Sequence, residues 1–184
     1  MVIKDVTATI EDLLQEPGKA ELIGGRIVRY MSTGEIPNLI AGRIFRHLAD
    51  FVERARLGFA YTDNMGFAVP ELPSGRQSFS PDVSFVAGPR KKTMRFLETA
   101  PTLAIEVRSE NEYKPGTEAG RAAKRADYFA AGTLVVWDVD PLGECIYAYR
   151  ASDPQRPATF RRGQQADGEP AVSGWRVDVE WVFA

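Results

Sequence analysis

Residues 101–109 read PTLAIEVRS, and the stretch TLAIEV within them is almost wholly apolar. An apolar run of this length between polar segments is typical of a central β-strand that is covered on both faces. The strand carries one acid, Glu106, near its end. Burying a carboxylate costs folding free energy unless a cation or a hydrogen-bond donor pairs with it. The stretch therefore predicts the centre of a sheet and a polar site at one end of it.

The segments around this strand predict a mixed α/β fold of the α+β kind, in which one sheet has helices on both faces. Before this strand we expect an amphipathic helix over residues 5–16 and an N-terminal hairpin in AELIGGRIVRY that turns at Gly24-Gly25. A longer helix should follow from Pro37 to Arg56, capped by Gly58. Strands are then expected in GFAYTD, MGFAVPE and DVSFVAG, which precede TLAIEV. After it we expect a helix over residues 117–131, a strand over residues 133–139 with CIYAYR as its hairpin partner, and C-terminal strands in ATFRR and SGWRVDVEWVF. The length suits a single domain over residues 1–184.

Composition narrows the class of protein. Of the 184 residues, 44% are hydrophobic and 26% are charged, as in ordinary globular domains. There is no run of about 18 apolar residues that could span a membrane. Asp5, Glu11 and Asp12 interrupt the apolar core that a signal peptide needs. We therefore expect a cytoplasmic protein with no membrane partner.

The side chains that could bind a metal favour oxygen ligands. The chain has one cysteine, Cys145, and one histidine, His47, so it can form neither a thiolate cluster nor a site with several histidines. The ligands of a bound metal would be mainly oxygen, which favours magnesium, manganese or calcium. His47 lies beside the apolar stripe of the long helix, and we interpret it as structural.

The charge of the chain limits how it can bind nucleic acid. Its net charge of −2 and pI of about 5.6 count against binding DNA through bulk positive charge. A local basic cluster lies in GPRKKTMRFLE, where Arg90, Lys91, Lys92 and Arg95 are interpreted as the solvated face of a short helix.

Two acids predict a catalytic metal site. Asp82 follows Pro81 and opens the strand DVSFVAG, and Glu106 lies near the end of TLAIEV. If these strands are neighbours, the two carboxylates converge at one end of the sheet. Together with the backbone carbonyl of Val107, they could hold one Mg²⁺ or Mn²⁺ whose other positions go to water and phosphate. Such an ion activates water and stabilises charge on a phosphate under attack.

The helix over residues 117–131 adds cationic groups. At about 100° per residue, Arg121, Lys124 and Tyr128 share one side, from which they can reach past the sheet edge. Arg108 follows the strand and can clamp a phosphate, but it cannot accept a proton at neutral pH. We therefore predict that Lys124 supplies the catalytic amine and that Arg108, Arg121 and Tyr128 bind the substrate. The neighbouring side of the helix is apolar and contains Ala122, Ala126 and Phe129.

These motifs resemble the PD-(D/E)xK restriction-endonuclease-like superfamily and, more closely, its Uma-two family of nucleases, formerly a domain of unknown function. The resemblance covers nearly the whole chain and follows an ordered series of segments: AELIGGRIV, SPDVSFV, PTLAIEVRS, KRADYFAAG, VVWDVDP and SGWRVDVEWVF. It implies a restriction-endonuclease-like core, a mixed sheet flanked by helices, and a metal-dependent phosphodiesterase site that acts on nucleic acid.

The resemblance also implies roles for single residues. Asp82 and Glu106 match the metal ligands, and Lys124 matches a catalytic lysine that has moved from the strand to the helix. Glu21 matches a frequent acidic position that completes the site or binds a second ion, and Tyr128 matches the tyrosine one turn after the lysine.

Two positions depart from the family pattern. Asn38 stands where relatives often carry histidine, near the start of the long helix, and Arg108 stands where they often carry an apolar residue.

Structural interpretations remain open for each candidate. Asp82 can cap a turn, Glu106 can form a buried ion pair with Lys124 or with Arg108 or Arg121, Lys124 can be an exposed helix residue, and Glu21 can be a solvated hairpin acid.

Three functional classes follow. They are a metal-dependent endonuclease acting on DNA, an inactive nuclease-fold module that binds nucleic acid or a protein partner, and an interaction module whose acids balance nearby cations. The complete set of Asp82, Glu106 and Lys124 favours the endonuclease. A homodimer would make paired cuts on a duplex easier.

Overall fold

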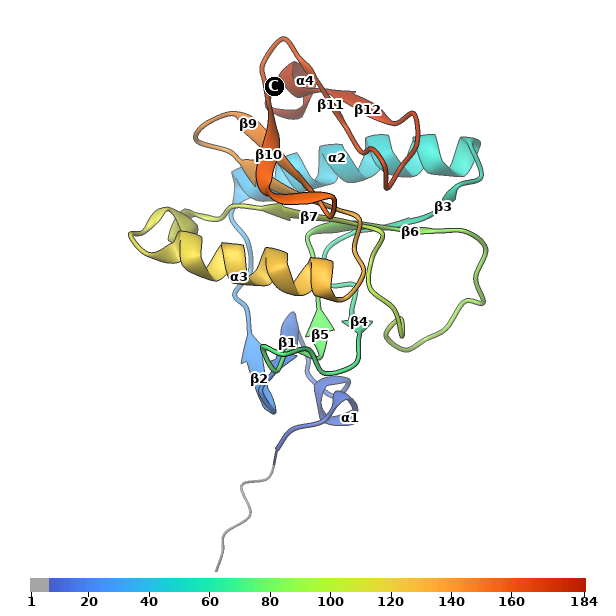
Figure 1. Cartoon of the computed structure of the whole chain (residues 1–184), viewed down its shortest axis with the longest axis vertical. Coiled ribbons are helices and arrows are strands. Elements are labelled where there is room, and N and C mark those ends of the chain that lie inside the picture. Colours follow the sequence, from blue (N-terminus) through green and yellow to red (C-terminus); the bar gives the residue numbers. More distant parts are fainter. Residues whose placement is uncertain (1–6) are drawn as a thin grey trace, which may run out of the picture.

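Figure 1 shows a central sheet with one long helix on each face, in a computed structural model that describes residues 7–184. The order of its six strands is β10-β9-β8-β7-β6-β3. Strand β7 pairs in parallel with β8 and antiparallel with β6. The sheet is therefore mixed, and TLAIEV supplies its central strand, as predicted. The strands are β3 (Gly58–Tyr61), β6 (Val83–Ala87), β7 (Leu103–Val107), β8 (Val135–Asp140), β9 (Cys145–Arg150) and β10 (Asp153–Arg161).

Helix α2 (Glu35–Arg54) packs on one face of this sheet through an apolar stripe. The stripe consists of Ile40, Ile44, Leu48 and Val52, all of them buried. Burial of each such side chain stabilises the fold by roughly 1.5–3 kcal/mol before the loss of conformational entropy is counted.

The ends of α2 differ slightly from those predicted. The helix begins at Glu35, so Pro37 occupies its third position, where a proline is tolerated because the first-turn N–H groups have no partner within the helix. Its C-cap is Ala55, whereas the expected cap, Gly58, opens β3 with a φ of +152°. A Cβ at Gly58 would lie 2.1 Å from the carbonyl oxygen of Val86. Gly58 is therefore required by the close approach of β3 to β6.

His47, on α2, belongs to the core on this face. Its Nδ1 accepts a hydrogen bond of 3.0 Å from Nε1 of Trp175, and Trp175 stacks on Trp137 with ring centroids 4.9 Å apart. These contacts agree with a structural histidine.

Helix α3 (Thr117–Ala130) covers the opposite face. Its Tyr128 and Phe129 belong to an apolar cluster that includes Ala104 and Val136 of the sheet, and ion pairs to β7 and β8 lie beside this cluster. Arg125, Asp127 and Tyr128 are buried, whereas Ala122 and Ala126 are exposed. Of the two cations predicted to reach past the sheet edge, Arg121 instead contacts Asp138 on β8. Lys124 contacts Glu106 near the end of β7.

A smaller layer lies beyond α3 in Figure 1 and consists of two hairpin-like pairs. The predicted N-terminal hairpin forms β1 (Ala20–Ile23) and β2 (Arg26–Arg29), and φ is positive at both Gly24 and Gly25, as a tight two-residue turn requires. The second pair joins β4 (Phe67–Ala68) to β5 (Ser78–Phe79). Strand β1 is held to β5 by a 2.7 Å hydrogen bond from the Leu22 N–H to Ser78 Oγ.

The chain ends differ most from the predictions. Helix α1 (Ile10–Leu13) is shorter than residues 5–16, of which 5 and 6 lie outside the described residues. Strand β10 is longer than ATFRR, and only Arg176–Asp178 of the final segment is a strand, β12, paired with β11 (Gln165–Asp167). The chain then enters helix α4 (Val179–Val182), because the Asp178 carboxylate caps it by accepting from the Glu180 N–H at 3.0 Å.

The basic segment is also not helical. Residues 89–93, which include Arg90, Lys91 and Lys92, have no regular secondary structure and belong to the connection between β6 and β7. None of the helices within residues 7–184 combines the length and the apolar character that a membrane crossing requires.

Candidate active site

The register of β6 and β7 brings Asp82 and Glu106 to the same end of the sheet. Val83 pairs with Ile105, so the residue before Val83 faces the residue after Ile105. The backbone N–H of Val107 donates a 2.8 Å hydrogen bond to Asp82 Oδ2. Asp82 therefore lies beside the end of β7, where the sequence predicted the two acids to meet.

Glu106 is fixed by two side chains of α3. Its Oε1 accepts a 2.6 Å hydrogen bond from the Tyr128 hydroxyl and lies 2.8 Å from Lys124 Nζ. Tyr128 is fully buried and stacks on Phe79 with ring centroids 4.2 Å apart. Tyr128 thus orients Glu106, and its hydroxyl is covered from solvent.

The environment shifts the pKa of both partners. Burial raises the pKa of Glu106, and the nearby Asp82 and Glu21 add to this effect against the opposing influence of Lys124 and Lys19. Burial alone would lower the pKa of Lys124, but Glu106 and Glu21 outweigh it and raise the value. Lys124 is consequently held as an ammonium ion.

Glu21, on β1, supports Lys124 from the other side. Its Oε1 lies 3.1 Å from Lys124 Nζ and accepts from the Ser80 N–H at 3.0 Å. Its Oε2 accepts from the Tyr30 hydroxyl at 2.8 Å and from the Arg76 guanidinium. A carboxylate has about four lone-pair positions, so these four donors saturate a side chain that is fully buried.

The electrostatics of Glu21 follow from these partners. Burial raises its pKa, but Lys124 and Arg76, with the donated hydrogen bonds, lower it to about 2. Glu21 is therefore an anion at neutral pH that pairs with Lys124, and it has no vacant lone-pair direction for a second ion.

Sequence reasoning missed Lys19. Its Nζ lies 2.6 Å from Asp82 Oδ1 and 2.6 Å from Asp63 Oδ1. The one available signal was its spacing from Glu21, because residues two apart on an extended segment point to the same side. Burial lowers the pKa of Lys19, but the nearby Asp82 and Glu106 carboxylates outweigh this effect, and the net pKa is raised. The Lys19 side chain is therefore also cationic. Arg76 and Asp127, which pair at 2.9 Å behind Glu21, were missed as well.

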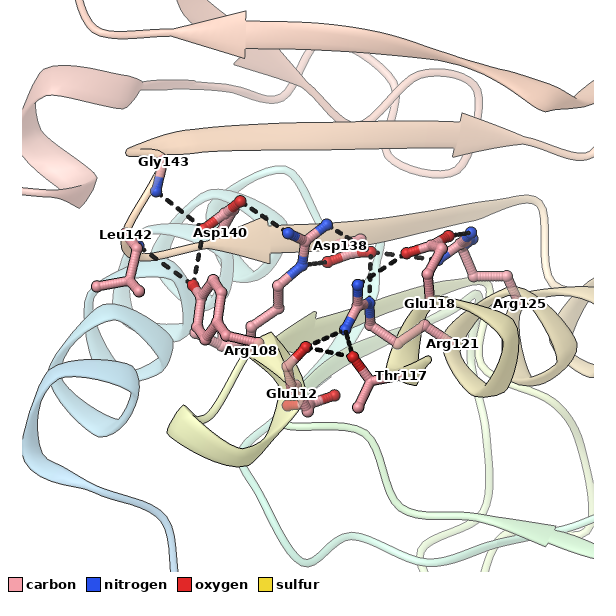
Figure 2. Close-up of polar contacts among 12 residues, drawn as sticks. Arg108, Glu112, Thr117, Glu118, Arg121, Arg125, Asp138, Asp140, Leu142 and Gly143 are labelled. Atoms are coloured by element: carbon pink, nitrogen blue, oxygen red, sulfur yellow. Dashed lines mark hydrogen bonds and ion pairs between the residues drawn. The ribbon is translucent and has the colours of Figure 1, made fainter. Parts of the chain in front are cut away.

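Arg108 and Arg121, predicted to bind the substrate, lie in a separate polar network over β8, shown in Figure 2. Arg108 donates to Asp138 and Asp140 at 2.7 Å each. Arg121 donates to Glu118 at 2.8 Å and contacts Asp138 at 3.6 Å. Only 13% of the Arg108 side chain and 17% of the Arg121 side chain are exposed.

This network ties α3 to the sheet. Arg125 also contacts Asp138, at 3.2 Å, and Asp138 is the register partner of Glu106 on the adjacent strand. The guanidinium groups therefore hold the helix that carries Lys124 and Tyr128, and the structure does not bring Arg108 or Arg121 into contact with Asp82 or Glu106.

The donor set fits a hydrated hard cation. Within the described residues, no three His, Cys, Asp or Glu side chains form a group that could hold a metal ion. Two carboxylates suffice for Mg²⁺ or Mn²⁺ when water and phosphate supply the other oxygens. No hydrogen bond from residues 7–184 reaches Glu106 Oε2, and 26% of that side chain is exposed.

The local charge also suits a divalent cation. Five carboxylates and three cations form a cluster of two groups of ion pairs around the site, which together leave two negative charges in excess. The members of this cluster are Glu21, Asp63, Asp82, Glu106 and Asp127 with Lys19, Arg76 and Lys124.

Comparison with known proteins gives a consistent picture. The model of the Uma2 family, described as "Putative restriction endonuclease", matches residues 8–180. A solved structure from Anabaena variabilis, described as a "putative nuclease belonging to DUF820", superposes with a TM-score of 0.75. That chain is 19% identical, and the match covers 95% of this chain and 97% of the other, so it shows the same fold. No curated protein matches the chain.

Proposed function

We propose that this chain, which belongs to the Uma2 family, is a metal-dependent endonuclease that hydrolyses phosphodiester bonds of DNA. The family description and the nuclease-fold neighbour support a nuclease. The observation that carries the proposal is the convergence of Asp82 and Glu106 at one sheet end, with the Lys124 ammonium 2.8 Å from Glu106.

Each residue has a distinct role in this proposal. Asp82 and Glu106, with the Val107 carbonyl, would hold Mg²⁺ or Mn²⁺, which when bound activates water and stabilises charge on the phosphate. Lys124 keeps its proton and donates hydrogen bonds to a phosphate oxygen, so it acts as a charge stabiliser and does not accept a proton. Tyr128 and the Val107 N–H hold the two carboxylates in fixed orientations.

Glu21 positions the lysine. It binds Lys124 from the buried side, so the ammonium faces Glu106 and stays charged. The arginine network over β8 keeps α3 at a fixed distance from β7 and thereby keeps Lys124 and Tyr128 at Glu106. A homodimer that makes paired cuts stays a prediction.

The test is cleavage of supercoiled plasmid DNA with Mg²⁺ or Mn²⁺. We expect the native chain to nick or linearise the plasmid and Asp82→Asn and Glu106→Gln each to lose at least about 100-fold in rate, the scale of losing one charge-stabilising group. Asp153→Asn, which removes one exposed carboxylate from the edge strand β10, is the matched control and should cleave normally. Equal cleavage by native chain and Asp82→Asn would mean a contaminating nuclease or a different site. Binding of DNA without cleavage would instead favour the inactive nucleic-acid-binding module.

A further inference from the structure

Lys19 forms an ion pair with Asp82, one of the two proposed metal ligands. Its Nζ lies 2.6 Å from Asp82 Oδ1, and the Val107 N–H is 2.8 Å from Oδ2, so both oxygens of this carboxylate are already engaged. On Glu106, in contrast, Lys124 and Tyr128 share Oε1. Both carboxylate oxygens of Asp82 therefore have a partner, whereas the partners of Glu106 share one oxygen.

Lys19 also has a second anionic partner directly outside the site. Asp63 lies in the turn after β3, and its Oδ1 accepts a 2.7 Å hydrogen bond from the Asn64 N–H, which fixes the carboxylate. Lys19 Nζ lies 2.6 Å from this same oxygen. The Asp63 side chain is 42% exposed and the Asp82 side chain 18%, so Lys19 bridges an inner and an outer acid.

From this bridge we infer that Lys19 is a built-in counter-ion that competes with a divalent metal for Asp82 and thereby sets the metal affinity of the site. The inference rests on the proposed function, because it assigns a role to Lys19 at the same carboxylate pair. A divalent cation bound at Asp82 would repel Lys19 across a few Å and weaken its pairing with Asp82, which would leave Lys19 paired with Asp63 alone. Asp63 is then the acid that stabilises Lys19.

The two residues should therefore affect metal binding with opposite signs. Lys19→Met removes the competing charge while keeping the length of the side chain, and it should tighten Mn²⁺ binding about tenfold. Asp63→Asn removes the outer partner, leaves Lys19 on Asp82 and should weaken Mn²⁺ binding about threefold. In the double variant the effect of Asp63→Asn should fall below about twofold, because Lys19 is no longer present to be redistributed.

Mn²⁺ affinity is measured by isothermal titration and by the loss of the electron paramagnetic resonance signal of free Mn²⁺, with no DNA present. Lys91→Met, in the irregular segment between β6 and β7, is the matched control for removing one positive charge and should bind Mn²⁺ like the native chain. Circular dichroism at each titration temperature confirms that every variant is folded.

The outcomes separate this inference from the proposed function. If the native chain binds Mn²⁺, Asp82→Asn does not, and Lys19→Met tightens binding, the inference is supported. If the native chain binds Mn²⁺ through Asp82 but Lys19→Met binds equally or more weakly, the inference is overturned and the metal site stands. If neither the native chain nor Lys19→Met binds Mn²⁺, both the inference and the metal-dependent function fail.

Discussion

Replacement of Glu21 by glutamine should destabilise the fold strongly, although Glu21 lies on β1, outside the six-stranded sheet. Glu21 is fully buried and accepts from Lys124, Arg76, Tyr30 and the Ser80 N–H. A glutamine amide keeps one acceptor oxygen and turns the other position into a donor, so it faces donors that it cannot satisfy. It also leaves the buried Arg76 and the half-buried Lys124 without the anion that they share.

Two routes give the size of this effect. Breaking a buried ion pair by removing one partner typically costs about 3–5 kcal/mol. The pKa of Glu21 falls from 4.5 to about 2, and at 1.36 kcal/mol per unit this corresponds to about 3 kcal/mol of stability at neutral pH. Both routes point to a loss of about 3 kcal/mol, which is a large share of the roughly 5–15 kcal/mol by which domains are stable.

The same pKa gives a pH dependence. Because the folded-state pKa of Glu21 is depressed, its contribution is fully present above pH 4.5 and is lost as the pH falls toward 2. About 2 kcal/mol of it should be gone at pH 3. The raised pKa of Glu106 acts in the opposite direction, so the informative quantity is the difference between native chain and variant.

Urea unfolding at pH 7 and at pH 3 measures this difference. We expect Glu21→Gln to be about 3 kcal/mol less stable than the native chain at pH 7 and about 1 kcal/mol less stable at pH 3. Glu98→Gln, at an exposed position, is the control and should change stability by less than about 0.5 kcal/mol. A Glu21→Gln variant as stable as the native chain at pH 7, or a difference independent of pH, would refute the reasoning.

Three further predictions concern the supports of the site. Tyr128→Phe should cost about 1–3 kcal/mol of stability and slow cleavage because Glu106 loses its hydrogen bond; thermal melting and the plasmid assay measure this, and unchanged values in both would contradict it. Asp138→Asn should lower stability by about 3 kcal/mol, measured by urea unfolding, because it weakens the pairing of Arg108, directly after β7, and of the α3 arginines; a loss below about 1 kcal/mol would mean that these arginines find other partners. Gly58→Ala should destabilise the fold by more than about 1 kcal/mol, since its Cβ would meet the Val86 carbonyl oxygen, and a melting temperature equal to that of the native chain would disprove this close approach.

The acids could be predicted because each has a local signature. Pro81-Asp82 stands at the head of a strand, and Glu106 interrupts a strand that is otherwise apolar. The period of α2 likewise predicted its buried stripe. Arg76 has no local signature, and the only local signal for Lys19 is its spacing from Glu21. Their partners Asp82 and Glu21 lie 63 and 55 residues away and meet them only in the folded chain.

Helix α3 shows a different failure. Its exposed alanines, its buried Arg125 and its half-buried Lys124 reverse the usual relation between polarity and burial. Exposing an alanine to water costs little free energy, whereas charged side chains are buried where side chains of opposite charge pair with them. Those opposite charges, Asp138 and Glu106, are supplied by β8 and β7, so periodicity within the helix alone could not reveal its inner face.

The most direct measurement is X-ray anomalous scattering from a crystal of the native chain soaked in Mn²⁺. We expect a single strong difference peak at the end of β6 and β7, within bonding distance of oxygens of both Asp82 and Glu106, and no such peak in Asp82→Asn. A peak elsewhere, or none in a crystal where Lys19 and Lys124 still hold the two acids at saturating Mn²⁺, would contradict a metal-dependent nuclease.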